Sequence, residues 1–150
     1  MEYIEKNRFR EVGNLHSVEN IKYKDLRIVQ SEVLRDLFLS VNWESGKYPE
    51  RLVVAMQNSD SVFSAWDNEK LVGLINILDD GIMTAYIHFL LINPEYQGKG
   101  IGKELLRMTK EKYKDYLRVV LIAEDKEVGF YQNSGFEIFK GATGMVINSF

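Results

Sequence analysis

The stretch that decides the fold is Tyr96-Gln97-Gly98-Lys99-Gly100-Ile101-Gly102-Lys103, which follows an apolar run and opens a helical pattern. Three of the five residues from 98 to 102 are glycine, which costs backbone entropy and adds no side-chain packing. Another group must therefore come close to this backbone. Free N–H groups in a helix's first turn bind anions together with the helix dipole, and Lys99 and Lys103 add positive charge. The pattern predicts a pyrophosphate site; the alternative is a connection that only allows tight strand–helix packing.

The elements around this turn predict an α+β fold with a mixed central sheet. Period-two alternation and turn residues predict an antiparallel meander in the middle of the chain. Strands are expected over 20–26, 62–66, 71–78, 83–92, 118–123, 136–140 and 145–147. Helices are expected over 29–41, from Pro49 to 56, from the glycine turn to about 116, and over 126–133. We expect one domain over 1–150, with residues 1–16 at its periphery and a loop over 42–48.

Two other phosphate-binding motifs fail on single residues. A dinucleotide fingerprint needs a third glycine where Lys103 stands. A P-loop needs Ser or Thr after its lysine, and Glu104 occupies that position.

The glycine turn instead resembles the acetyl-CoA-binding motif of the GNAT N-acetyltransferases, written Gln/Arg-x-x-Gly-x-Gly and here spanning 97–102. The preceding residues 87–96 look like that family's fourth strand and its turn. A second stretch, Gly129-Phe130-Tyr131-Gln132-Asn133-Ser134-Gly135-Phe136, looks like its helix ending in Phe-Tyr followed by Gly-Phe. Two motifs in the correct order are more specific than either alone, and the resemblance covers about residues 20–147.

The resemblance implies a GNAT-like, mostly antiparallel sheet flanked by about four helices. It also implies that the fourth and fifth strands splay apart at a bulge and hold acetyl-CoA between them. By motif alignment, backbone groups of Leu90 and Ile92 would bond the pantetheine arm, and the Leu90 N–H would stabilise the thioester oxygen. The residues implied in cofactor binding are Leu90, Leu91, Ile92, Gln97, Gly98, Lys99, Gly100, Ile101, Gly102, Lys103 and Tyr131.

Acetyl transfer uses an acid for the leaving thiolate and a base for the amine. Tyr131 matches the family's usual general acid; the alternative is a ring that packs beneath the cofactor and makes only a hydrogen bond. His88 is the predicted base, on the same strand face as Tyr86 and Leu90 by alternation. A partly buried histidine with a structural role is the alternative, and Tyr86 and Glu124 are other candidates for the base.

The loop over 42–48 carries Trp43 and Glu44, which would suit a lid over a cationic amine; the alternative for Trp43 is a core anchor at a helix end. Two positions depart from the family pattern. Glu124 stands where an asparagine is common, and Asn133 stands where a lysine or arginine is common, which puts the contacts around the adenosine in doubt.

Composition narrows the range of possible functions and partners further. The chain has no cysteine and two histidines, which argues against a metal site. Its net charge is −3, yet residues 95–118 carry +3, which suits a compact polyanion better than nucleic acid. A charged start and no long apolar run predict a cytoplasmic protein without a membrane partner. The predicted function is acetyl transfer to a small-molecule amine, with protein lysines or N-termini, or a non-catalytic acyl-CoA sensor, as alternatives. Monomer and homodimer both remain open.

Overall fold

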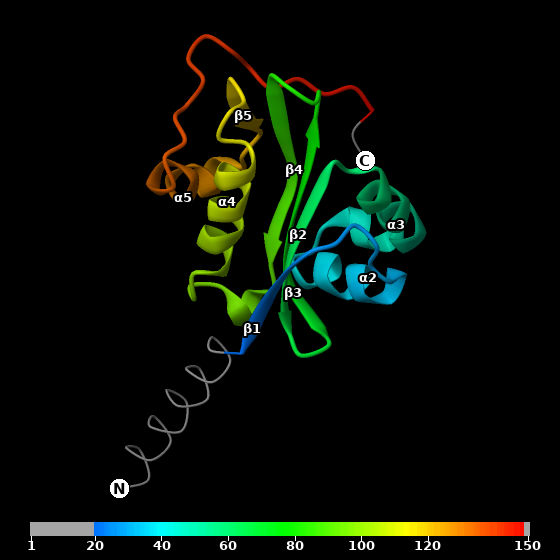
Figure 1. Cartoon of the computed structure of the whole chain (residues 1–150). Coiled ribbons are helices and arrows are strands. Elements are labelled where there is room, and N and C mark those ends of the chain that lie inside the picture. Colours follow the sequence, from blue (N-terminus) through cyan, green and yellow to red (C-terminus); the bar gives the residue numbers. More distant parts are fainter. Residues whose placement is uncertain (1–19, 149–150) are drawn as a thin grey trace, which may run out of the picture.

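The computed structural model describes residues 20–148 of the chain (Figure 1). The expectation that residues 1–16 are peripheral lies outside the described residues and stays a prediction. The elements follow in the order β1 Ile21–Asp25, α2 Ser31–Ser40, η1 Glu44–Lys47, α3 Pro49–Asn58, β2 Ser61–Asp67, β3 Lys70–Asp79, β4 Thr84–Ile92, η2 Pro94–Tyr96, α4 Ile101–Lys112, β5 Arg118–Leu121, η3 Asp125–Glu127 and α5 Val128–Asn133.

The five strands form one sheet in chain order, β1-β2-β3-β4-β5. The first three pairings are antiparallel, and β5 runs parallel to β4. The parallel pair is possible because α4 carries the chain back along the sheet between the two strands. Helices α2 and α3 cover one face of the sheet, and α4 with α5 lies on the other (Figure 1). The predicted α+β class with a mixed, mostly antiparallel sheet and four helices is confirmed.

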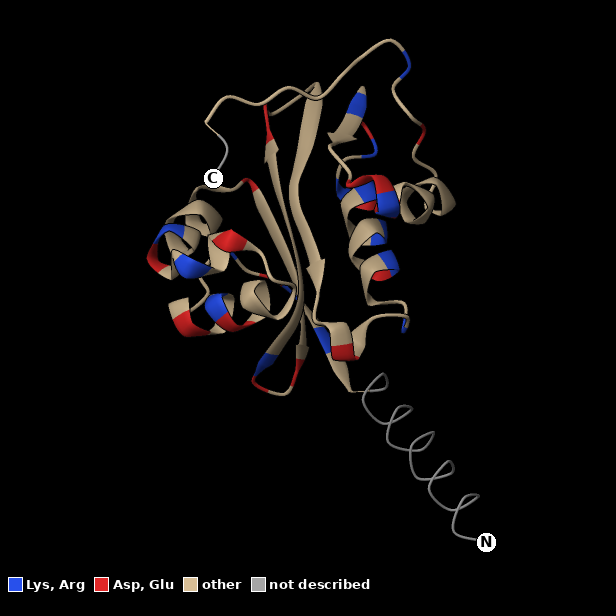
Figure 2. Cartoon of the chain, turned by 180° about the vertical axis from the view of Figure 1, so that it is seen from behind, with Lys and Arg blue, Asp and Glu red and all other residues tan. Residues whose placement is uncertain are grey.

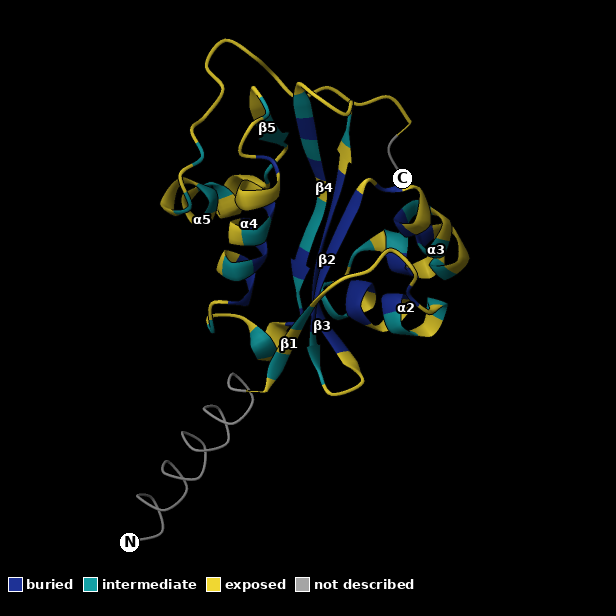
Figure 3. Cartoon of the chain, in the orientation of Figure 1, coloured by how far each residue is buried: buried dark blue, intermediate teal, exposed yellow. Residues whose placement is uncertain are grey.

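Two apolar clusters hold these layers together. One joins β2, β3 and β4 to α4 through residues such as Ile75, Ile87 and Leu105, and the other joins the sheet to α2 and α3 through Phe38 and Leu74. Each fully buried side chain of this size stabilises the fold by roughly 1.5–3 kcal/mol. Figure 3 shows this burial on the inner strands and on the helix faces turned toward them. The site therefore rests on a sheet packed on both faces.

A bulge divides β4 into two halves. Asn76 of β3 lies opposite Phe89, whereas the next residue, Ile77, lies opposite Ile87, so His88 is the extra residue. Buried Asn76 pins this bulge, because its side-chain oxygen accepts a hydrogen bond from the Phe89 N–H at 2.9 Å and its amide donates to Ser59 at 3.0 Å. Both the oxygen and the nitrogen of this buried amide thus have a partner, which fixes the shape of the strand.

The bulge reverses which side chains face which helices. Ala85 and Ile87 pack in the α4 cluster, but after the bulge Leu90 and Ile92 do so, while Phe89 packs with α2 and α3. The prediction that His88 shares a face with both Tyr86 and Leu90 is wrong for Leu90. Strict alternation holds only for a strand with no extra residue.

Most element bounds agree with the sequence to within a few residues. Helix α4 ends at Lys112 instead of continuing to about 116, and the hydroxyls of Tyr113 and Tyr116 both donate to Asp79 at the end of β3, at 2.9 and 3.0 Å. The loop over 42–48 contains the short helix η1.

The closing strands expected over 136–140 and 145–147 are wrong. These residues adopt no strand conformation, and apart from half-buried Phe136 their large apolar side chains, including Ile138, Phe139 and Ile147, are exposed. A strand needs a hydrogen-bonded neighbour as well as an alternating pattern, and within residues 20–148 this segment has none.

Candidate active site

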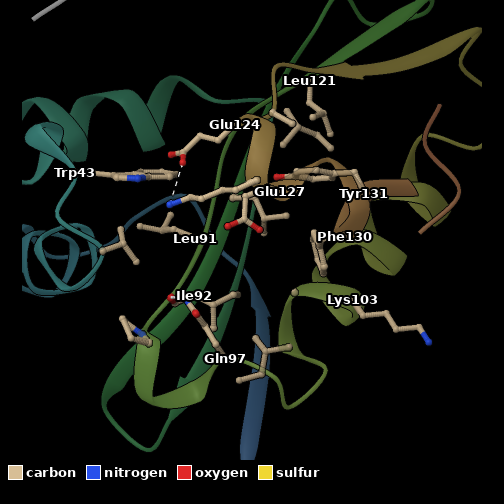
Figure 4. A pocket seen from close by; sticks show the side chains of 18 of the residues that line it. Trp43, Leu91, Ile92, Gln97, Lys103, Leu121, Glu124, Glu127, Phe130 and Tyr131 are labelled. Atoms are coloured by element: carbon tan, nitrogen blue, oxygen red, sulfur yellow. Dashed lines mark hydrogen bonds and ion pairs between the residues drawn. The ribbon is translucent and has the colours of Figure 1, made fainter. Parts of the chain in front are cut away.

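A cavity of about 610 Å³ opens where β4 and β5 separate (Figure 4). Five parts of the chain line it: residues 40–43 after α2, the second half of β4, the glycine turn with the start of α4, residues 121–124, and α5. The cavity reaches both faces of the sheet, because its lining includes Trp43 on the α2 side and Phe130 on the α4 side. Two molecules can therefore meet in it from opposite faces.

The glycine turn forms one end of the cavity. Gly98 and Gly100 have φ angles of +74° and +86°, a left-handed conformation that other residues rarely adopt. A Cβ atom added at either position would have no neighbour within 4 Å, so open space lies in front of this backbone. Gly100 precedes α4, and no side chain from residues 20–148 caps the start of that helix. The first N–H groups of α4 thus remain available to an anion, with the positive end of the helix dipole behind them.

The remaining predicted residues of the turn have distinct places. A Cβ at Gly102 would lie 3.0 Å from the Phe130 ring, so this glycine allows α4 and α5 to approach each other closely. Lys103 lines the cavity, whereas Lys99 is not among the lining residues, and its ammonium lies 5.3 Å from the centre of the Tyr96 ring. Gln97 donates a side-chain hydrogen bond to the Ile92 carbonyl at 3.0 Å.

Strands β4 and β5 separate just before the bulge. Their ladder pairs Thr84–Ile87 with Arg118–Leu121 and then stops. The N–H groups of Phe89 and Asn93 turn toward β3, where they bond Asn76 and Val72. By alternation, the backbone groups of Leu90 and Ile92 turn to the opened side, where Gln97 reaches Ile92, while the backbone of Leu91 faces β3. The strand pair is splayed as predicted.

Tyr131 on α5 lines the cavity beside the end of β5 (Figure 4). Its ring packs edge-on against Phe130 and Phe136, with centroids 5.2 and 5.8 Å away. Burial, then the negative charges of Glu127 and Glu124, raises the pKa of Tyr131 to about 12. The phenol therefore stays protonated at neutral pH and can donate a proton.

His88, the bulged residue, lines the cavity from the α2 side of β4. Its ring stacks on Phe89 with centroids 3.9 Å apart and on Tyr86 at 6.0 Å. Burial lowers the pKa of His88 below its ordinary 6.5, so the imidazole is neutral at pH 7 and can accept a proton. Since Tyr131 belongs to α5 on the α4 side of the sheet, the predicted acid and base approach the cavity from different faces.

The α2 side of the cavity is aromatic. Trp43 lines it and also packs with Phe38 and Phe89, with centroids 6.0 and 5.8 Å apart, as the core-anchor alternative predicts; its role as a lid stays a prediction. Glu44 is not among the lining residues and pairs with Lys47 at 2.9 Å. The carboxylates on the cavity wall belong instead to Glu124 and Glu127, and Glu124 pairs with Lys126 at 3.2 Å (Figure 4).

The site combines a glycine-rich helix start, a splayed strand pair and a tyrosine between them. Comparison with known proteins identifies the family to which this combination belongs. A family model described as the acetyltransferase (GNAT) domain matches residues 31–144. The chain belongs to the GNAT acetyltransferase family. It is therefore an acyltransferase, as the two sequence motifs indicate.

Relatives support the assignment. An uncharacterised N-acetyltransferase of Prochlorococcus marinus is 31% identical over 146 residues, covering 88% of this GNAT chain and 81% of that protein. A GNAT-family acetyltransferase structure from Streptococcus pneumoniae has a TM-score of 0.75 at 33% identity, over 86% of this chain and 98% of that one. A ribosomal-protein-alanine N-acetyltransferase from Brucella melitensis, at 19% identity and a TM-score of 0.64 over 86% and 99% of the two chains, shares the fold.

Two residues and one hydrogen bond of this GNAT site were not expected from the sequence. Asn76 sits mid-strand, and a polar residue in an otherwise apolar run is the signal that could have indicated it. Glu127 gives no such signal, because an acidic residue near a helix start is ordinary. The hydrogen bond of Gln97 to Ile92 depends on where β4 ends, which only the tertiary structure shows.

Two general findings complete the description. Among residues 20–148, no group of three or more His, Cys, Asp or Glu side chains is placed to hold a metal ion. Over the same residues, no helix has the length and hydrophobicity that crossing a bilayer requires.

Proposed function

We propose that this GNAT enzyme transfers the acetyl group of acetyl-CoA to a primary amine of a small, positively charged molecule by direct attack in a ternary complex. The supporting observation is that one cavity joins the free helix start, the opened half of β4 and Tyr131. A pyrophosphate at α4, with the pantetheine arm along β4, would bring a thioester close to Tyr131. Acetyl-CoA supplies the activated acetyl group; the protein supplies position, an oxyanion donor and proton transfer.

In the proposed reaction, the amine nitrogen attacks the thioester carbonyl carbon, so that an N–C bond forms and the C–S bond breaks. The Leu90 N–H stabilises the oxygen as it gains negative charge. Tyr131 gives its proton to the departing sulfur, and the amine's proton leaves through water to His88. Solvent then restores both side chains.

The carboxylates on the cavity wall support a cationic acceptor. Glu124, which pairs with Lys126, and Glu127 lie close enough to Tyr131 to raise its pKa, and Trp43 offers an aromatic face on the α2 side. A diamine or aminosugar could place one amine at the thioester and a second cation at Glu127. Side chains of protein lysines could do so only with an extended peptide in the cavity.

The test measures thiol release from acetyl-CoA with matched acceptors: diamines, monoamines of equal length, an aminosugar and a lysine peptide. Diamines are expected to give the highest kcat/KM. Glu127→Gln should raise their KM about fivefold, because a partly exposed ion pair contributes up to ~1 kcal/mol, and should leave monoamines unchanged. Asp125→Asn, which removes a nearby carboxylate outside the cavity lining, is the control. Turnover of peptides alone would favour a protein acetyltransferase, and cofactor binding with no turnover of any amine would favour a sensor.

A further inference from the structure

Lys126 places a primary amine on the wall of the cavity. It belongs to η3, directly before α5, the helix that carries Tyr131. Among the described residues that line the cavity, only Lys103 also has a primary amine. Lys103 belongs to the first turn of α4 and points away from Tyr131 in Figure 4. Lys126 is therefore the lysine that the cavity offers at its Tyr131 end.

A carboxylate connects this amine with Tyr131. Glu124 lies 3.2 Å from the Lys126 ammonium. Burial is the largest cause of the raised pKa of Tyr131, and the negative charges of Glu127 and Glu124 add to it. Figure 4 shows the Glu124 side chain extending across the cavity toward Trp43. One carboxylate is thus close both to the amine and to the tyrosine.

The ion pair between Lys126 and Glu124 is open to solvent. The two side chains are 74% and 54% exposed. An ion pair this exposed is weak, and the four-carbon stem of a lysine is flexible. The Lys126 amine can therefore leave Glu124 and enter the cavity without disturbing a packed residue.

We infer that Lys126 is a modification site, whose amine takes the acetyl group of acetyl-CoA bound in the cavity of the same chain. This inference rests on the proposed use of acetyl-CoA. An amine that shares a cavity with a thioester has a high effective concentration, so it reacts faster than an equally exposed amine elsewhere on the surface. The chemistry is the one proposed for the acceptor, with the protein's own lysine in the acceptor's place.

In this reaction the Lys126 ammonium first gives one proton to water through Glu124. The free Nζ attacks the thioester carbonyl carbon, an N–C bond forms, and the C–S bond breaks. The nitrogen loses its second proton to water, and Tyr131 protonates the departing sulfur. The products are a neutral acetyl-lysine and the thiol of CoA. Acetylation removes one positive charge from the wall and leaves Glu124 without its cationic partner, and therefore open to a cationic acceptor.

Peptide mass spectrometry of the full chain, incubated with acetyl-CoA and no acceptor, tests the modification. Lys114 is a matched control in the same molecule, because it is 60% exposed and pairs with Glu111 at 3.0 Å. It follows α4, where basic and acidic residues lie close together (Figure 2), and it is not among the cavity-lining residues. Lys126 should be acetylated about tenfold faster than Lys114 or more, because only Lys126 shares the cavity with the thioester. Equal rates would show spontaneous acetylation and overturn the proposal.

Two further measurements show whether the reaction takes place inside the cavity of one chain. An excess of CoA should slow the acetylation of Lys126 and leave that of Lys114 unchanged, because CoA competes for the cavity. The fraction of Lys126 that is modified should not depend on protein concentration, because the amine and its thioester belong to one molecule. Insensitivity to CoA, or a fraction that rises with protein concentration, would overturn the proposal.

Variants separate this inference from the proposed function. Lys126→Arg keeps the positive charge but removes the amine, so its mass should stay unchanged under conditions in which Lys114→Arg gains one acetyl group. Thiol release with the amine panel is measured on the same preparations. If acceptors are turned over while Lys126 stays unmodified, self-acetylation is overturned and the proposed function stands. If neither reaction occurs, both are overturned.

Discussion

The two halves of β4 differ in whether β5 pairs with them. In the first half, Thr84–Ile87, the strand has neighbours on both sides, β3 and β5. In the second half, His88–Ile92, β5 is absent and the cavity takes its place. Both halves have similar apolar sequences, so the bulge at His88 and its buried partner Asn76 make the difference. Within nine residues, the strand is thus a core element in one half and a cavity wall in the other.

The largest expected effect comes from removing the Tyr131 hydroxyl, which lies beside the open half of β4. Tyr131→Phe should lower kcat by tenfold or more, because loss of a general acid typically costs 10²- to 10⁴-fold, with little change in acetyl-CoA affinity. Tyr116→Phe removes a matched hydroxyl near the closed half, where it bonds Asp79, and should leave kcat unchanged. Steady-state kinetics of both variants compare the two halves directly. Equal kcat values would remove Tyr131 from the chemistry.

The next largest effect is expected on removing the Asn76 side chain, which holds the bulge between the two halves of β4. Asn76→Leu leaves the Phe89 N–H without its acceptor, and a buried unpaired donor costs about 2 kcal/mol. Urea unfolding should show that loss of stability, and acetyl-CoA affinity should also fall because β4 can no longer hold its bulge. Asn58→Leu, at an exposed position at the end of α3, is the control. If Asn76→Leu kept full cofactor affinity, the bulge would not be what opens the strand pair.

The smallest expected effect is a pH dependence at the bulge itself. Burial lowers the pKa of His88, so the folded protein takes up its proton at a lower pH than the unfolded chain, whose value is near 6.5. If His88 is the base, kcat/KM should fall along an acidic limb below pH 6.5, and His88→Ala should abolish that limb. A limb that persists would point to Glu124, Tyr86 or the amine.

The free energy of unfolding is expected to fall over the same pH range. The unfolded state binds the proton more readily, so the stability associated with neutral His88 is present above pH 6.5 and is lost as the pH falls below that value. Urea midpoints measured between pH 7.5 and 5 should decline more in the natural protein than in His88→Ala.

Some features of the site could be predicted from the sequence and others could not. The glycine turn and Tyr131 are local signals: left-handed φ angles require glycine, and an uncapped helix start binds anions wherever it lies. The faces of β4 were mispredicted beyond His88, because one extra residue changes the parity of every side chain that follows. Glu44 was expected at the amine and Glu127 was not, since both are acidic residues near helix starts and only packing places one of them on the cavity wall.

The sequence by itself determined most of the elements, the antiparallel meander and the chemical character of the cradle, because these depend on neighbours along the chain. Only the tertiary structure decided where β4 and β5 part, which carboxylates line the cavity, and that residues 136–147 have no strand beside them within residues 20–148. Those features depend on contacts between residues distant in sequence, and the periodicity of one segment holds no information about its partner. The apolar pattern of residues 136–140 and 145–147 predicted strands, and the prediction failed because pairing requires a second strand.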